Sequence, residues 1–272
     1  MGWFPHTFRQ PPPSRIIRPS SSAHAEKPAR VKSVVISLVG MTERRSLIES
    51  QFEALGLGFD FLDAVDARKN EHVRLSRYDE AATMARYGAP LSAPEIGCFA
   101  SHFAAWQLCV ERDEPLAIFE DDVLLDPRFP EVLALAAARI EQHRLIRLFG
   151  KHNRSSRQLE ALDSRYTLVR FQRGPIGTQC YCLSPAGARA LLARATRWSE
   201  PVDHYLDRFW LHGVASNAIV PYELKEISRD ILVGAIGARS HRRTGMAKFR
   251  RELTRQTDAL ARLIYNIRHW PR

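Results

Sequence analysis

The chain has 272 residues, of which 45% are hydrophobic and 26% charged, a composition typical of a globular protein with a sizeable core. Its net charge of +10 lies at the two ends: residues 1–32 carry six Lys/Arg and one acid, and residues 239–272 carry ten Lys/Arg and two acids. Removing these +5 and +8 leaves residues 33–238 at −3. The body therefore lacks the basic face that nucleic-acid binding needs, and we expect no nucleic-acid partner.

Residues 1–30 are rich in Pro, Ser and Arg, which predicts a disordered leader. They contain no apolar run of the ~7–15 residues that a secretory signal needs, and no segment of the chain reaches the ~20 apolar residues of a membrane span. The four cysteines form no CxxC pair, so we expect buried free thiols. Together these features favour a cytoplasmic protein.

The first ordered segments alternate between strand and helix. Residues 34–39 form a nearly continuous β-branched run, which is typical of a strand buried on both faces of a parallel sheet. Residues 42–55 have apolar positions at helical spacing, and residues 59–65 predict a second strand. This order begins a βαβ unit, so we predict an α/β fold with one domain over residues 31–238.

Further along, Ser92 and Glu95 form an S-x-x-E capping box that opens a helix to about Arg112, followed by an apolar strand at 115–119. Beyond it we predict a helix at 130–142, a strand at 145–149, an irregular polar segment at 151–173, a strand at 178–184 and a helix at 185–197. The strand at 115–119 ends in an acidic triplet. The carboxyl ends of strands are where open α/β sheets place their ligands.

The triplet is Glu120-Asp121-Asp122. Adjacent carboxylates repel one another, and placing them at a strand end is costly unless a cation or basic groups neutralise them. Oxygen-only ligands favour hard divalent ions such as Mg²⁺ or Mn²⁺, which also bind substrate phosphates. The alternative for an isolated triplet is a solvated acidic turn. The apolar strand before it favours the metal site.

Several blocks in this order resemble glycosyltransferase family 25, the group of lipooligosaccharide and procollagen galactosyltransferases. The resemblance spans roughly residues 33–230. Its blocks are Val35-Ile36-Ser37-Leu38 with Glu43-Arg44-Arg45, Asp63-Ala64-Val65-Asp66, Glu95-Ile96-Gly97-Cys98 with Ser101-His102, residues 119–123, Gly177-Thr178 with Tyr181 and Ser184, Gly187-Ala188, and Pro201-Val202-Asp203.

The resemblance implies a GT-A-like single domain whose central, mostly parallel sheet is flanked by helices. It also implies a UDP-sugar donor, a divalent metal (Mn²⁺ or Mg²⁺) and inversion at the anomeric carbon by direct displacement. We therefore expect transfer of a hexose, galactose in the first instance, to a glycan acceptor such as a lipooligosaccharide. No residue of the sequence chemically distinguishes galactose from glucose.

The resemblance also implies roles for the acids. Asp122 is expected to bind the metal directly, and Glu120 to act on the metal, through water or on the donor's ribose. Asp121 is assigned to the donor or to orienting the turn. His241 is a candidate for completing the metal shell from the C-terminal segment.

Donor contacts are expected from residues of the remaining blocks, although some have structural alternatives. Arg44 and Arg45 suit phosphate, but they can equally be solvated charges in the first turn of a helix. His102 shares one helix face with Glu95 and Cys98, and a lone helical His is often structural. Ser37 and Asp66 complete the expected donor set.

A displacement reaction also requires a base that removes the proton of the acceptor hydroxyl. Asp203, in the Pro-Val-Asp block, is the candidate. Its alternative is an N-cap for a helix around residues 204–211.

Residues 239–272 predict a basic amphipathic helix, because Met246, Phe249, Leu253, Leu260, Ile264 and Ile267 share one face. One interpretation is a helix packed on the body through this stripe. The other, which we favour, is attachment to anionic lipid at the inner membrane surface, where a lipid-linked acceptor would lie. Rival functions for the whole chain are a metal-dependent phosphohydrolase and a nonenzymatic nucleic-acid or membrane adaptor that uses the basic ends.

Overall fold

The structure is a computed structural model that describes residues 31–69, 72–227 and 245–270. The predicted leader at 1–30 and the candidate ligand His241 lie outside these residues. The strands are β1 (Lys32–Ser37), β2 (Phe59–Asp63), β3 (Leu116–Glu120), β4 (Val123–Leu125), β5 (Leu145–Arg147), β6 (Ser156–Ala161), β7 (Thr167–Phe171), β8 (Cys180–Leu183), β9 (Asn217–Val220) and β10 (Leu224–Glu226). The α-helices are α1 (Thr42–Ala54), α2 (Glu80–Tyr87), α3 (Ala93–Arg112), α4 (Phe129–Ala137), α5 (Ile140–His143), α6 (Pro185–Arg194), α7 (Val202–Leu206), α8 (Phe209–His212) and α9 (Gly245–His269).

The central sheet has eight strands in the order β2-β1-β3-β8-β5-β9-β7-β6. Strands β2, β1 and β3 are parallel to one another, as are β5 and β9, while β8 runs antiparallel to both β3 and β5 and the β6-β7 edge is antiparallel. A second sheet pairs β4 with β10. The predicted α/β class is confirmed, and the mixed sheet is consistent with a GT-A-like domain.

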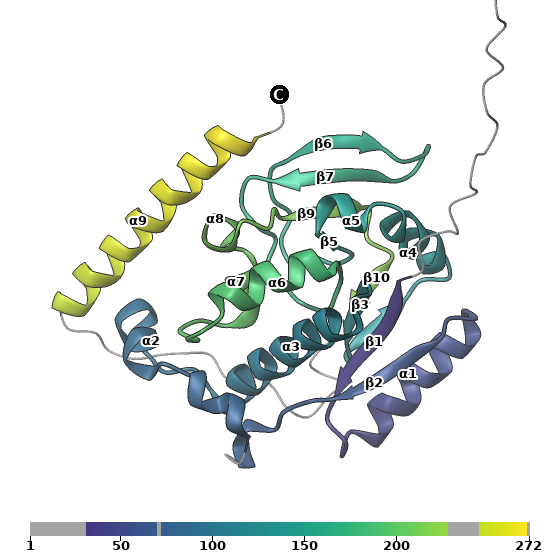
Figure 1. Cartoon of the computed structure of the whole chain (residues 1–272), viewed down its shortest axis with the longest axis horizontal. Coiled ribbons are helices and arrows are strands. Elements are labelled where there is room, and N and C mark those ends of the chain that lie inside the picture. The colour runs from purple at the N-terminus through teal and green to yellow at the C-terminus, as the bar shows by residue number, and fades with distance from the viewer. Residues whose placement is uncertain (1–30, 70–71, 228–244, 271–272) are drawn as a thin grey trace, which may run out of the picture.

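Helices cover both faces of the sheet (Figure 1). On one face α3, α6 and α7 pack over the side chains of Val34, Ile118 and Tyr181. On the other face α1 and α4 pack over Val35 and Phe119. Neighbouring residues of one strand thus point into different cores, as the two-residue period of a strand requires, which explains the continuous apolar runs of β1 and β3.

The helix α3 begins as the sequence predicts. The Ser92 side chain accepts from the backbone of Glu95, and the Glu95 side chain accepts from the Ser92 backbone, so the capping box is complete. One turn further, Gly97 lies so close to the Val65 carbonyl that a Cβ would collide with it. A glycine therefore lets the start of α3 press against the segment after β2, and both border the cavity described below.

Three segments differ from the prediction. The single helix expected at 130–142 is two helices, α4 and α5, because the chain turns at 138–139. The segment 151–173 is not irregular but contains the β6-β7 hairpin at the sheet edge. Strands β9 and β10 were not expected. Among the described residues, no helix is long and apolar enough to cross a membrane.

Candidate functional site

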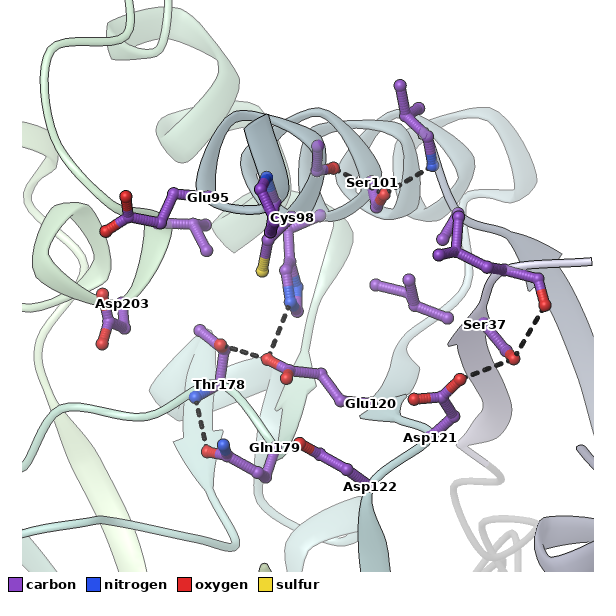
Figure 2. Close-up of a pocket in the computed structure, with 18 of the residues that line it drawn as sticks. Ser37, Glu95, Cys98, Ser101, Glu120, Asp121, Asp122, Thr178, Gln179 and Asp203 are labelled. Carbon is purple, nitrogen blue, oxygen red and sulfur yellow. Dashed lines mark hydrogen bonds and ion pairs between the residues drawn. The ribbon is translucent and has the colours of Figure 1, made fainter. Parts of the chain in front are cut away.

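A cavity of about 540 Å³ opens at the carboxyl ends of β1 and β3, beside the start of α3. Acidic side chains of α3, α7, β10 and the end of β3 line it, together with Asp66 and polar groups of the loop before β8. The triplet that follows β3 lies on one side, and Glu95 and Asp203 lie on the other (Figure 2). The cavity thus lies at the sheet edge where the sequence placed a ligand site.

Glu120 is held by two hydrogen bonds to the same oxygen. His102 Nε2 lies 3.3 Å from Glu120 Oε1, and the Thr178 hydroxyl donates to that atom. Burial alone raises the pKa of Glu120, but the hydrogen bond and charge of His102 and the bond from Thr178 outweigh it, and the pKa lies below its ordinary value. Glu120 is therefore an ionised carboxylate with a fixed direction.

Asp121 is neutralised within the protein. Ser37 Oγ donates to Asp121 Oδ2 at 2.7 Å, and Arg44 Nη1 lies 3.0 Å from Asp121 Oδ1. This ties the end of β3 to the end of β1 and to the first turn of α1. Asp121 is thereby anchored in the wall, and Arg44 is partly committed to it.

Asp122 has the opposite environment. Its Oδ1 is buried and has no hydrogen-bond partner among the residues that the structure describes. Burial, followed by the neighbouring charges of Glu120, Asp121 and Glu226, raises the pKa of Asp122 to about 7. A buried carboxylate oxygen without a donor, surrounded by like charges, lacks the positive group that would stabilise it.

A chain of buried groups stands behind Glu120. Trp106 Nε1 donates to the Tyr181 hydroxyl at 2.8 Å, and that hydroxyl lies 2.9 Å from His102 Nδ1. Because an ionised Glu120 only accepts, His102 Nε2 donates to it, and the Tyr181 hydroxyl contacts the other ring nitrogen, Nδ1. The helix α3 and strand β8 thus orient His102, which orients Glu120.

Two sets of residues in the cavity have the composition of a metal site. Ligand atoms of Cys98, His102 and Glu120 lie within 4.8 Å of one another. However, both ring nitrogens of His102 already have partners, and burial raises the pKa of the Cys98 thiol well above its ordinary value, which disfavours the thiolate ligand. Asp122 with Glu120 offers carboxylate oxygens and an unmatched negative charge. This second set fits a hard divalent ion better.

Asp203 lies in α7 on the side of the cavity away from Asp122 (Figure 2). Its Oδ1 accepts from the amide of His204 at 2.8 Å. The N-cap of α7 is Pro201 and makes no side-chain capping bond, so the interpretation of Asp203 as an N-cap is wrong: the helix begins at Val202, two residues earlier than that interpretation requires. The carboxylate of Asp203 is instead a lining group of the cavity.

Comparison with known proteins identifies the family of this chain. A model described as glycosyltransferase family 25 (LPS biosynthesis protein) matches residues 31–206. The chain belongs to glycosyltransferase family 25. Residues beyond 206, including α8, β9, β10 and α9, lie outside that match.

Individual relatives of this family 25 chain align over shorter stretches. The lipooligosaccharide biosynthesis protein lic2B of Haemophilus influenzae is 37% identical over 101 residues, covering 37% of this chain and 36% of the relative. The lacto-N-neotetraose biosynthesis glycosyltransferase LgtB of Neisseria gonorrhoeae is 34% identical over 101 residues, covering 37% and 35%. A Bos taurus protein named probable inactive glycosyltransferase 25 family member 3 is 29% identical over 206 residues, covering 68% and 34%.

The chain thus spans about a third of the length of these relatives. Since the family includes a member named inactive, membership alone does not establish activity. Support for catalytic activity has to come from the arrangement of the site residues.

The cavity brings together most of the residues that the family resemblance nominated. Ser37, Arg44, Asp66 and His102 line it along with the triplet and Asp203. Asp66 is engaged by Arg68, whose Nε and Nη2 each lie 2.7 Å from its carboxylate oxygens. Arg68 also lines the cavity, although it stands in none of the family blocks.

Arg45 is the exception among the nominated residues that the structure describes. It is absent from the cavity lining. Its guanidinium contacts Asp63 at 2.5 Å and the Ser37 carbonyl at 2.9 Å, and lies 4.5 Å from the centre of the Phe61 ring. Arg45 therefore braces β2 against β1 instead of facing the site.

The lining residues missed as site residues also include Lys151, Thr178, Gln179 and Glu226. Lys151 Nζ lies 3.0 Å from Glu226 Oε2, and Gln179 Nε2 donates to Glu226 Oε1 at 3.2 Å. Thr178 stands in one of the family blocks, which was the available signal for it. Glu226 stands 104 positions after Asp122, and only the pairing of β10 with β4 brings the two together.

Proposed function

We propose that this chain is an inverting, metal-assisted hexosyltransferase that moves galactose from UDP-galactose to a sugar of a lipooligosaccharide or related surface glycan. The observation that carries this proposal is Asp122, whose buried Oδ1 has no partner among the described residues and lies at the edge of a cavity in a family 25 protein. Relatives named for lipooligosaccharide and lacto-N-neotetraose biosynthesis support the acceptor class.

In this proposal Asp122 holds a divalent ion, Mn²⁺ or Mg²⁺, with Glu120 as its neighbour. When bound, such an ion neutralises the charge that develops on the departing diphosphate of UDP. Glu120 arrives pre-oriented by His102 and Thr178, so little reorganisation is needed on binding. Lys151, 40% exposed and beside Glu226, is an additional cation facing the donor.

The acceptor side of the cavity is the side of Asp203. This carboxylate can accept the proton of an acceptor hydroxyl as that oxygen attacks the anomeric carbon from the face opposite the diphosphate. Separating the base from the acids at the end of β3 suits direct displacement, because the nucleophile and the leaving group then lie on opposite sides of one sugar. We therefore expect inversion at the anomeric carbon.

The test is UDP release by the full chain with Mn²⁺, a panel of UDP-hexoses, and glycan acceptors ending in different sugars. We expect turnover with UDP-galactose, an inverted product anomer by NMR, and loss of turnover in Asp122→Ala. Asp113→Ala, which removes an exposed carboxylate 77% accessible at its side chain, is the matched control and should keep full activity.

Two outcomes would contradict the proposal. One is full activity in Asp122→Ala. The other is release of inorganic phosphate from phosphate esters without any acceptor, which the phosphohydrolase rival predicts.

A further inference from the structure

The C-terminal helix α9 packs against the body through charged and aromatic side chains. Asp258 forms ion pairs with Arg86 of α2 and with Arg208, the latter at 3.0 Å. Tyr265 stacks near Phe209 of α8 with ring centroids 5.1 Å apart. The helix is therefore docked through its polar side, not through the apolar stripe that would support packing on the body.

The helix α9 lies at the outside of the molecule (Figure 1), and its apolar stripe is exposed. Residues 253, 260, 264 and 267 recur at helical spacing, and 263 lies beside them. The exposed aliphatic side chains are Leu253 (56% exposed), Leu260 (58%), Leu263 (55%), Ile264 (41%) and Ile267 (74%). A row of this kind is costly in water, and it marks a surface that another apolar phase covers.

The charge of the helix indicates which phase that is. Residues 245–269 contain six Lys/Arg and two acids, and both acids are already paired, Asp258 with the body and Glu252 with Arg255 at 3.0 Å. Two copies of this helix packed stripe to stripe would bring their basic charges together. An anionic lipid surface offers both an apolar interior and opposite charge.

We propose that α9 lies along an anionic bilayer surface, with the stripe of residues 253, 260, 263, 264 and 267 in the acyl boundary and its exposed basic residues, such as Arg255 and Arg268, at the headgroups. The body-facing side keeps its ion pairs with α2 and α8 in this arrangement. No part of the domain has to unfold for the helix to dock.

The docked helix is close to the acceptor side of the cavity. Arg86, which pairs with Asp258, is followed by Tyr87, whose hydroxyl lies 3.0 Å from His204 Nδ1, and His204 lines the cavity beside Asp203. If the proposed function holds, membrane docking brings this side of the cavity near a lipid-linked acceptor. The docking itself does not depend on that function.

The experiment is co-sedimentation of the full chain with phosphatidylcholine vesicles prepared either with or without anionic phosphatidylglycerol. We expect binding to the anionic vesicles that weakens with salt. In Leu260→Gln/Ile267→Gln the affinity should fall by about tenfold or more, because two large apolar side chains no longer enter the lipid. Gln keeps the helix, and both positions are exposed, so folding should be unaffected.

The matched control is Val39→Gln/Val73→Gln, which removes two exposed aliphatic side chains outside α9 (64% and 81% exposed) and should bind as the parent does. Three results would overturn the proposal. The parent could bind neutral and anionic vesicles equally, or the α9 variant could bind as the parent does. The parent could also form a dimer without lipid that the α9 variant dissociates. UDP release with a short water-soluble acceptor should be the same in all three proteins. Loss of that activity in the parent would count against the proposed function, not against docking.

Discussion

At the scale of single residues, Asp121 and Asp122 show how adjacent carboxylates acquire different tasks. Asp121 receives a hydroxyl and a guanidinium and becomes part of the wall. Asp122, one position later, receives neither at its buried Oδ1. The difference arises from the neighbouring elements: β1 and α1 face Asp121, whereas Asp122 faces the acids Glu120 and Glu226. One carboxylate is left available for a cation.

The first prediction concerns Asp122→Asn in metal-free protein. In the folded state the pKa of Asp122 is about 7, against an ordinary value of 3.8, so the folded chain binds more protons than the unfolded chain between these values. Parent stability therefore falls as pH rises through this window, and the penalty is complete above about pH 7. The variant lacks this penalty, so its Tm should exceed the parent's at pH 8, with the difference shrinking toward pH 4.

Differential scanning calorimetry in EDTA across this pH range measures the difference in Tm. Each kcal/mol of difference in the free energy of unfolding corresponds to roughly 2–4 °C in Tm. With Mn²⁺ present the same variant should lose turnover by about 100-fold or more, because a group that stabilises charge in the transition state is gone. Asp113→Asn is the control for both readouts. A variant Tm that stays at or below the parent's at pH 8 would refute the electrostatic description of Asp122.

The second prediction separates positioning from stability with two buried tyrosines. Tyr181→Phe removes the hydroxyl between Trp106 and His102, and Tyr205→Phe removes a hydroxyl that donates to the Leu191 carbonyl at 2.6 Å. Tyr181→Phe should lower the free energy of unfolding by about 1–3 kcal/mol, since it leaves Trp106 Nε1 and His102 Nδ1 buried without this partner. Tyr205→Phe should cost about 0.5–1.5 kcal/mol, since the Leu191 carbonyl keeps its bond from the Ala195 amide.

Only Tyr181→Phe should also lower kcat, by about tenfold, because it loosens the histidine that orients Glu120. Urea unfolding and UDP-release kinetics on the two variants provide the comparison. Equal loss of kcat in both would mean that the Tyr181 chain acts through general stability.

At the scale of elements, the loop before β8 is held by a buried ion pair. Arg147 of β5, 1% exposed, lies 2.6 Å from Asp207 and donates to the Gly177 carbonyl, and Asp207 accepts from the Ile176 amide at 2.9 Å. Gly177 has φ +93° and Ile176 φ +59°, so both occupy the left-handed region. The pair thus fixes a strained loop whose next residue, Thr178, contacts Glu120.

The third prediction follows from that pair. Asp207→Ala should lower the free energy of unfolding by about 3–5 kcal/mol, because it leaves the guanidinium of Arg147 buried and uncompensated. Glu160→Ala, which breaks the more exposed pair with Arg139 (side chains 45% and 21% exposed), should cost less than about 1 kcal/mol. Denaturant unfolding of both variants checks this, and a similar cost for the two would contradict the role of burial.

The elements that sequence reasoning found are those with a strong local signal. The capping box at Ser92, the apolar runs of β1 and β3, and the helical spacing in α1 each determine structure within a few residues. The β6-β7 hairpin was missed because β6 is an edge strand whose side chains are mostly exposed, and such a strand has no apolar alternation to detect. The start of α7 at Val202 was missed because Pro201 caps it without a side-chain bond.

The candidate site shows the same limit. The sequence was sufficient to nominate the triplet, Ser37, His102 and Asp203 as site residues, because each stands in a family block. Glu226 was not, since its role arises only from the antiparallel pairing of β10 with β4. The sequence also could not predict that Arg45 points away from the cavity. Adjacent positions of a helix differ in direction by about 100°, and the local sequence does not indicate which of the two arginines faces the cavity.

At the scale of the whole molecule, the cavity lies where the two halves of the sheet meet. β1 and β3 supply Ser37 and the triplet from the parallel half, while the loop before β8 supplies Thr178 and Gln179. The strand β8 is antiparallel to β3, so the loop that precedes it lies at the same sheet edge as the end of β3. A ligand that joins these elements should stabilise the fold as a unit.

The last prediction uses this coupling. UDP with Mn²⁺ binds only the folded chain in our proposal, so at about 100 times its Kd it should add about 2.7 kcal/mol to the free energy of unfolding. For a chain of this size that corresponds to a rise in Tm of roughly 5–10 °C. UDP in EDTA should give a much smaller rise, and in Asp122→Asn the rise with Mn²⁺ should fall to the EDTA level. Thermal melts of the parent, Asp122→Asn and Asp113→Asn under these conditions make the comparison, and a full UDP shift in EDTA would show that the diphosphate binds without the metal.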